Sequence, residues 1–482
     1  MAHKIKVLQI STECYPAAKA GGMGDVVGAL PLYLPGQGIE SSVVIPRYKR
    51  KWFEDHSFVS IHSGTVALGE RDVQFEIQKL ASTELGYPFY CVNIPGLFDR
   101  EDIYLADDGH GYPDEKERYI SFQLAILHWL TDGTESFDVL HCHDHMTGLI
   151  TFLMQYCEAF RKLKDIPTAF TIHNGEYRGV FGWEVMAYFP WFEEGRGGLL
   201  DWDGDINSLA TALKCAWKVN TVSPAYMQEL IDDMGALTPL IRHEQAKCLG
   251  IINGIDDVLW NPETDKYLKN RRLVKNNWKG FKSKNKTFLL KKYDLKARRP
   301  LIGFIGRMAH QKGADILIES VEQCLAEGMK FSTVVLGSGD KQIETSLVDL
   351  AKKYPRDIGV TIAYDEKLAR AIYAGCDFLM MPSRFEPCGL NQMYSMRYGT
   401  VPIVSHVGGL KDTVPDINDN GYGIVARSVD AEGFKEGIQR AIAFYGDKSG
   451  LAKHIKKITK IDYSWNNSAS QYAEMYRELL KN

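Results

Sequence analysis

The sequence predicts an α/β protein with two doubly wound domains. Short apolar segments rich in β-branched residues alternate with longer amphipathic segments along the chain. Apolar segments of this kind are typical of buried parallel strands, and the amphipathic ones of the helices that cover them. The alternation occurs twice, and 482 residues are too many for one ordinary core. We therefore expect two Rossmann-like sheets with separate cores.

The apolar segments give the expected strands. In the first half these are Ile5–Ile10, Ser42–Ile45, Phe89–Ile94, Val139–Cys142, Ala169–Ile172, Val219–Val222 and Gly250–Ile252. In the second half they are Leu301–Ile305, Thr333–Leu336, Val360–Ala363, Phe378–Met381, Val401–Val404 and Gly423–Val425. The expected domains are 1–255 and 256–462, and residues 463–482 are expected to form one amphipathic helix.

A basic segment, about residues 262–299, opens the second domain. A solvated helical linker and a polyanion site are both compatible with it. The net charge of −4 and the lack of interleaved aromatic residues favour the linker and argue against nucleic-acid binding.

The cysteines and the N-terminus indicate the compartment. Nine cysteines are scattered singly without a C-x-x-C pair, which favours a reducing environment. No signal-peptide core or membrane-length apolar stretch is present in the sequence. We expect a cytoplasmic protein with no membrane partner.

A glycine-rich turn follows the first expected strand. It reads Lys19-Ala20-Gly21-Gly22-Met23-Gly24-Asp25, with a helix expected from about Val26. A helix N-terminus at the carboxyl end of a strand attracts phosphate, although a purely structural turn is an equal alternative. The G-x-G-x-x-G pattern of dinucleotide-binding proteins is broken by Val27, so NAD binding is excluded.

Polar residues follow two further strands of the first half. In His141-Cys142-His143-Asp144-His145, strand periodicity predicts three histidines on one face and Asp144 beyond the strand. Zinc is one alternative, but adjacent strand residues alternate faces, and a polar rim for sugar hydroxyls is preferred. His173-Asn174 ends the next strand and is expected at the same rim.

The second half has three polar strand ends. Arg307 and Lys312 follow the strand Leu301–Ile305, where cations can neutralise a leaving diphosphate; solvated surface cations are the alternative. Glu386 and the turn Pro387-Cys388-Gly389-Leu390 follow Phe378–Met381, and Gly408-Gly409 follows Val401–Val404.

Taken together, these motifs resemble those of bacterial glycogen synthases and plant starch synthases. The matching stretches, in family order from residue 5 to about 415, are KAGGMGDVVGALP, HCHDHMTG, FTIHN, TVSP, INGID, GRMAHQKG, PSRFEPCGLNQMYSMRYGTVP and GGLKDTV. The resemblance implies a GT-B fold, in which the two domains face each other across a cleft and the C-terminal helix crosses back to the first domain. It implies transfer of glucose from a nucleoside diphosphate, ADP-glucose on the bacterial side, to an α-1,4-glucan, with retention and without a metal or cofactor.

The resemblance also implies site residues. His173, Arg307, Lys312 and Glu386 are the implied catalytic residues. Donor binding is implied for Lys19, Gly21, Gly22, Asp25, Asn253, Tyr364, Cys388, Gly389, Leu390, Gly408 and Gly409, and a core tyrosine is the alternative for Tyr364. Acceptor binding is implied for Asp144, His145 and Asn174. No carboxylate is obviously poised as a nucleophile, so a front-side mechanism is expected.

Three positions depart from the family pattern. His145 stands where an aromatic residue is usual and Asn391 where threonine is common, which bears on acceptor and donor preference. Tyr394 replaces a second glutamate of related transferases, as is normal in this branch. The alternatives are the same fold using UDP-glucose or another acceptor, and a catalytically silent sugar- or nucleotide-binding protein.

Overall fold

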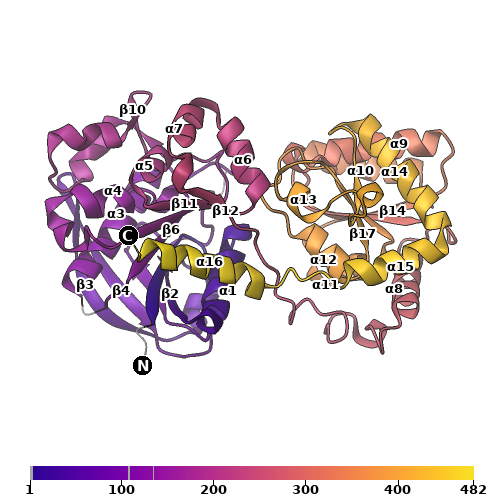
Figure 1. Ribbon diagram of the computed structural model, residues 1–482, viewed down its shortest axis with the longest axis horizontal. Coiled ribbons are helices and arrows are strands. Elements are labelled where there is room, and N and C mark those ends of the chain that lie inside the picture. Colours follow the sequence, from indigo (N-terminus) through magenta and orange to yellow (C-terminus); the bar gives the residue numbers. More distant parts are fainter. Residues whose placement is uncertain (1–3, 107–108, 134, 482) are drawn as a thin grey trace. The chain divides into compact units, whose positions relative to one another are not determined.

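The computed structural model describes residues 4–106, 109–133 and 135–481. The chain divides into two compact units (Figure 1). Unit 1 consists of Met1–Val222, Met227–Gly254 and Trp465–Asn482, and unit 2 of Ser223–Tyr226 and Ile255–Ser464. Both are α/β units with a parallel sheet, as the sequence predicts.

Unit 1 contains a nine-stranded sheet. In order across the sheet, the strands are β12 (Cys248–Gly250), β11 (Lys218–Thr221), β7 (Thr168–Ile172), β6 (Val139–His143), β1 (Ile5–Ile10), β2 (Ile39–Pro46), β5 (Phe89–Asn93), β4 (Arg71–Leu80) and β3 (Phe58–Leu68). The strands from β12 to β5 pair in parallel and correspond to the seven predicted ones. Their order reverses between β1 and β6, which makes this pair the switch point of the sheet.

Two features of unit 1 were not predicted. The first is the hairpin β3–β4, which extends the sheet in antiparallel register next to β5. Its residues alternate between buried and exposed, so it lacks the continuous apolar run of a buried parallel strand. The second is a three-stranded sheet of β8 (Val180–Phe181), β10 (Asp205–Asn207) and β9 (Asp201–Trp202).

Helices accompany the sheet of unit 1. They are α1 (Gly22–Tyr33), α2 (Lys51–Asp55), α3 (Glu115–Asp132), α4 (Ile150–Tyr156), α5 (Ser208–Cys215), α7 (Thr238–His243) and α16 (Trp465–Leu479), with α6 (Pro224–Asp232) shared with unit 2. Helix α1 begins at Gly22, four residues before the predicted start, so two further glycines belong to its first turn. None of the helices in the described ranges has both the length and the apolar character that crossing a membrane requires.

The C-terminal helix α16 packs on unit 1, as the sequence predicts (Figure 1, yellow). Its buried face includes Trp465, Tyr472, Tyr476 and Leu479. They form one core cluster with side chains of α1 and of the first strands. Since the two tyrosines are four residues apart, both hydroxyls point to the same side of the helix.

Unit 2 contains a six-stranded parallel sheet. Its strand order is β15 (Ile358–Ile362), β14 (Ser332–Gly337), β13 (Leu301–Ile305), β16 (Phe378–Met381), β17 (Val401–Val404) and β18 (Ile424–Val425). This is the 3-2-1-4-5-6 order of a Rossmann sheet, with its switch point between β13 and β16. The helices of unit 2 are α8 (Trp278–Lys292), α9 (Ala314–Ala326), α10 (Lys341–Lys353), α11 (Glu366–Gly375), α12 (Asn391–Arg397), α13 (Gly408–Thr413), α14 (Ala431–Gly446) and α15 (Lys448–Ile458). Aspartate side chains cap four of them by accepting backbone N–H groups, at Asp340, Asp365, Asp430 and Asp447.

The basic segment is not the solvated linker that the sequence favoured. Its helix α8 buries Phe281 and Leu289 in the core of unit 2. Lys282 is also buried, and its Nζ donates to the Thr400 hydroxyl at 2.5 Å and to two backbone carbonyls. Lys286 pairs with Asp377 at 2.5 Å. The many lysines of this segment suggested a solvated surface. Two of them instead pack their apolar stems against unit 2 and place their amines beside polar partners.

Lys282 is expected to make unit 2 more stable at alkaline pH. Burial lowers the pKa of its amine from 10.5 to about 7, so between these values the unfolded chain binds a proton that the folded chain does not. Stability then rises with pH, by about 2 kcal/mol between pH 7 and pH 9. Urea unfolding at the two pH values tests this, with Lys282→Met as the variant that should lose the increase. An equal increase in the variant would assign the pH dependence to other groups.

Candidate active site

In unit 1, three loops with predicted site residues follow neighbouring strands around the switch point. The loop after β1 contains the glycine-rich turn, the one after β6 contains Asp144, and the one after β7 contains His173 and Asn174. Because parallel strands end at the same edge, the loops gather there, where open α/β sheets bind their ligands.

A buried glutamate, Glu13, holds the glycine-rich turn. Its Oε2 accepts the backbone N–H groups of Ala20 and Gly21 at 2.6 and 2.8 Å, and its Oε1 accepts the Tyr104 hydroxyl at 2.7 Å. The N–H of Gly21 therefore already donates to Glu13, and it is not free to bind the phosphate that the sequence suggested for this turn. Glu13 was missed, although an acidic residue three positions after a predicted strand is the signal that could have indicated it.

Lys19 is exposed and forms an ion pair across the same turn. Its Nζ lies 2.6 and 2.7 Å from the two carboxylate oxygens of Asp25. Burial raises the pKa of the Asp25 carboxyl, and the charge of Lys19 opposes this. The predicted donor residues Lys19 and Asp25 thus lie together at the start of α1, beside the exposed Gly22.

Asp144 organises the ends of β6 and β7. Its Oδ1 accepts the backbone N–H of His173 at 2.7 Å and that of Asn174 at 3.5 Å. Burial raises the pKa of its carboxyl to about 7, and the two backbone donors oppose this. The structure therefore brings the predicted residues Asp144, His173 and Asn174 into one cluster.

His145 lies outside strand β6, so the prediction that His141, His143 and His145 share one face of the strand is wrong. Strand β6 ends at His143, and Asp144 takes a left-handed conformation (φ 57°) that sends the chain into a short 3-10 turn. The His145 side chain is 11% exposed and packs edge-on against Tyr119. It therefore has little surface with which to stack on a sugar.

His141 and His143 use their ring nitrogens within the protein. His141 contacts the hydroxyls of Tyr476 and Thr171 at 2.7 and 2.6 Å, and His143 contacts Gln9 Oε1 and His173 Nε2 at 2.9 and 3.0 Å. Burial lowers the pKa of both rings, and that of His173 to about 3, so they are neutral. No group of three His, Cys, Asp or Glu in the described ranges is arranged to hold a metal ion.

Asn253 is the last predicted site residue of unit 1. Its side chain is 6% exposed, and its Oδ1 is buried without a hydrogen-bond partner among the described residues. A buried acceptor of this kind costs free energy unless a ligand satisfies it, which is compatible with the predicted donor role.

In unit 2, the predicted catalytic pair lies at the switch point of the sheet. Lys312, after β13, places its Nζ 2.6 Å from Oε2 of Glu386, after β16. The Ser383 hydroxyl donates to the same oxygen at 3.0 Å, and the carboxylate is almost fully buried. The two loops approach so closely at Gly313 that a β-carbon there would lie 1.9 Å from the Pro382 carbonyl oxygen. Glycine is therefore required for Lys312 to reach Glu386.

Arg307 lies on the same loop as Lys312 and is exposed. Its guanidinium donates to Gln311 Oε1 at 2.9 Å, and Gln311 donates to the Phe385 carbonyl at 3.4 Å. Arg384 also joins the two loops by donating to the His310 carbonyl at 2.8 Å, and it forms a bidentate pair with Asp315 at the start of α9. The cations therefore stand on a braced loop rather than on a free surface segment.

The other predicted donor residues differ in what they offer. Tyr364 is 91% exposed, which excludes the core alternative. Cys388 is buried, and Gly389 takes a left-handed conformation before Leu390 and helix α12. Gly408 and Gly409 begin the short helix α13. The N–H of Gly409 donates to the Glu386 and Pro387 carbonyls, so it is not available to donate to the diphosphate of the donor.

Two of the departures from the family pattern have structural partners. Asn391 donates to the Ile305 carbonyl at 2.7 Å and accepts the Tyr373 hydroxyl at 2.8 Å. Tyr394 stacks on Trp260 with ring centroids 3.9 Å apart. Both residues therefore contribute to the packing of unit 2.

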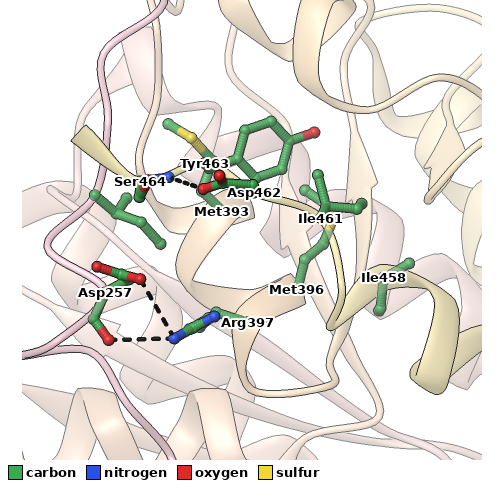
Figure 2. Close-up of a pocket in the computed structure, with 10 residues that line it drawn as sticks. Asp257, Met393, Met396, Arg397, Ile458, Ile461, Asp462, Tyr463 and Ser464 are labelled. Atoms are coloured by element: carbon green, nitrogen blue, oxygen red, sulfur yellow. Dashed lines mark hydrogen bonds and ion pairs between the residues drawn. The ribbon is translucent and has the colours of Figure 1, made fainter. Parts of the chain in front are cut away.

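Unit 2 also has a small pocket, shown in Figure 2. Met393, Met396 and Arg397 of α12 line it together with the segment that leads to α16. Arg397 donates to the Asp257 carbonyl and lies 3.8 Å from its carboxylate. None of its lining residues is a predicted site residue.

Comparisons with known proteins agree with this arrangement. Residues 6–243 match the model of the starch synthase catalytic domain, and residues 285–460 match that of the group 1 glycosyl transferases. The catalytic domain of starch synthase IV from Arabidopsis thaliana, solved with ADP and acarbose, covers 100% of both chains with a TM-score of 0.88 and 29% identity. The two units and the residues at their switch points thus define a glycosyltransferase of the GT-B fold.

Proteins with similar sequences indicate which family of glycosyltransferases the chain belongs to. Glycogen synthase from Flavobacterium johnsoniae is 41% identical over 99% of this chain and 100% of its own. Glycogen synthase from Lactobacillus acidophilus is 35% identical over 99% and 100%. The chain belongs to the glycogen and starch synthase family.

Proposed function

We propose that the protein transfers glucose from ADP-glucose to the 4-hydroxyl at the non-reducing end of an α-1,4-glucan, with retention of configuration. The observation that carries the proposal is the Lys312–Glu386 pair at the switch point of unit 2, with Arg307 on the same loop. The nucleotide in the similar starch synthase structure is ADP, and acarbose is a glucan analogue in chemical terms. Both support the choice of donor and acceptor.

In this proposal two cationic side chains stabilise the charge that develops during the reaction. Arg307 and Lys312 neutralise the charge that develops on the leaving diphosphate, and no metal or cofactor takes part. Glu386 keeps the Lys312 amine in place before the donor arrives, because the two lie 2.6 Å apart. The leaving phosphate oxygen takes the proton of the attacking hydroxyl on the same face of the sugar.

Unit 1 supplies neutral, acidic and basic groups to the reaction. The His173 ring is neutral, so it exchanges hydrogen bonds with sugar hydroxyls without adding a charge near the reaction centre. Asp144 and Asn174 are proposed to contact the acceptor, and Lys19, Asp25 and Asn253 the donor. In the same proposal residues 1–255 bind mainly the acceptor, and residues 256–462 bind the nucleotide-sugar donor. The cytoplasmic location stays a prediction.

The proposal predicts which nucleotide is released. With glycogen as the acceptor, ADP-glucose is expected to give a kcat/KM at least tenfold above that of UDP-glucose, measured as release of the two diphosphates. A preference for UDP-glucose would still support a glucosyltransferase, but it would contradict ADP-glucose as the donor. Binding of both donors without turnover would support a silent binding protein and contradict the proposal.

A further inference from the structure

Tyr476, on the C-terminal helix, is connected to His173 by side-chain hydrogen bonds within unit 1. Its hydroxyl lies 3.1 Å from Gln9 Nε2, Gln9 Oε1 lies 2.9 Å from His143 Nε2, and His143 Nδ1 lies 3.0 Å from His173 Nε2. Tyr476, Gln9 and His143 are completely buried. Water therefore does not exchange freely with these partners, and each hydrogen must have a fixed position.

The donors and acceptors along this chain fix one proton arrangement. The Gln9 amide nitrogen faces Tyr476 and Ser41, so its oxygen faces His143 and accepts from Nε2–H. A neutral imidazole has one N–H, so His143 Nδ1 is an acceptor and His173 Nε2 must donate to it. His173 then has no proton on Nδ1, which can only accept.

A second branch fixes the hydroxyl of Tyr476 itself. The Thr171 hydroxyl donates to Asn220 Oδ1 at 2.7 Å, so it accepts from His141 Nε2–H at 2.6 Å. His141 Nδ1 is then an acceptor, and the Tyr476 hydroxyl donates to it at 2.7 Å. Because the Tyr476 hydrogen points to His141, the Tyr476 oxygen can only accept, and it accepts from the Gln9 amide nitrogen. This contact holds the Gln9 amide in the orientation that determines the protonated nitrogens of His143 and His173.

We propose that Tyr476 is a positioning residue for the transfer reaction, which acts through Gln9 and His143 to keep the proton of His173 on Nε2 and Nδ1 free to accept a sugar hydroxyl. This inference rests on the proposed function, in which His173 contacts the donor sugar. It gives the C-terminal helix a second role, because the helix both completes the core of unit 1 and sets the protonation of a site residue.

The test compares two buried side chains of the same helix. In Tyr476→Phe the amide of Gln9 keeps only the Ser41 hydroxyl, which can donate or accept and therefore does not fix the orientation of the amide. A mixture of His173 tautomers is expected, together with a kcat about tenfold lower. The control is Met475→Leu, since Met475 is buried on the same helix and belongs to neither branch of hydrogen bonds. The control is expected to keep the Nε2–H tautomer and a kcat within twofold of the unsubstituted protein.

The tautomer is read directly by long-range ¹H–¹⁵N correlation in protein labelled on histidine nitrogens, with His173→Gln to assign the signal. Since this measurement needs no turnover, it tests the inference even if ADP-glucose is not the donor. An Nδ1–H tautomer in the unsubstituted protein, or an unchanged His173 signal in Tyr476→Phe, would overturn the proposal. An equal loss of kcat in Tyr476→Phe and Met475→Leu would also overturn it, because it would indicate a merely structural effect.

A third variant tests the route. Gln9→Met keeps the volume of the side chain but removes both hydrogen bonds between Tyr476 and His143. It is expected to lower kcat as much as Tyr476→Phe, and the double variant is expected to be no slower than either single one. Multiplicative effects on kcat would mean that the two residues act separately, contrary to the proposal.

Discussion

Replacing Lys312 with alanine is expected to lower kcat by about 10²–10³-fold, the usual cost of losing one preorganised group that stabilises developing charge. The substitution removes the cation that faces the leaving diphosphate and leaves Arg307 as the remaining one on that loop. The main effect should be on kcat rather than on KM, because the charge develops fully only in the transition state. Initial rates with ADP-glucose and glycogen measure both constants.

The fold is expected to survive this substitution, although Glu386 loses its ion pair. Its carboxylate keeps the hydrogen bond from the Ser383 hydroxyl. A matched control is Lys296→Ala, since Lys296 pairs at 2.8 Å with the nearly buried Asp357 but precedes β13, at the opposite edge of the same sheet. The control should change kcat less than twofold. Unchanged turnover in both Lys312→Ala and Arg307→Ala would refute the assignment of the diphosphate site.

The strands that the sequence predicted best are those that are buried on both faces. The bounds predicted for Ile5–Ile10, Leu301–Ile305, Phe378–Met381 and Val401–Val404 are those of β1, β13, β16 and β17. A short, continuous apolar run bounded by turn residues is typical of a strand that helices cover on both sides. The hairpin β3–β4 alternates polar and apolar residues at the edge of its sheet and was missed for that reason.

The positions of the site loops also followed from the sequence, because parallel strands end at one edge. This logic predicted one shared rim for Asp144 and His173, and the same geometry of strand ends accounts for the contact between Lys312 and Glu386. Partners that depend on distant segments could not be predicted in this way. Gln9 and Tyr476 are 467 residues apart, and no local pattern indicates that their side chains meet. The roles of these residues in catalysis stay predictions.

Ending the chain after Ser464 is expected to unfold unit 1 while unit 2 stays folded. The truncation removes α16 and with it the buried side chains of Trp465, Tyr472, Met475, Tyr476 and Leu479. Burial of each contributes about 2 kcal/mol, so their loss approaches the roughly 5–15 kcal/mol by which a typical protein is stable. It also leaves Gln9, His141 and Asn220 without their tyrosine partners.

Hydrogen exchange read by mass spectrometry distinguishes the two units. Amides of β1, β6 and β7 should lose protection in the truncated chain, whereas those of β13 and β16 should keep it. A control with Gln471→Ala and Glu474→Ala, on the exposed face of α16, should exchange like the unsubstituted protein. Retained protection of β1 after truncation would show that unit 1 is complete without its last helix.

A peptide of residues 465–482, added in trans, should restore protection to the strands of unit 1. Its buried face carries the contacts that the truncated chain lacks, and the sheet it covers comes from the other end of the sequence. Unit 1 therefore cannot complete its core during synthesis until the whole of unit 2 has been made. Helix α16, which follows unit 2 in the sequence, thereby determines when strand β1 becomes stable.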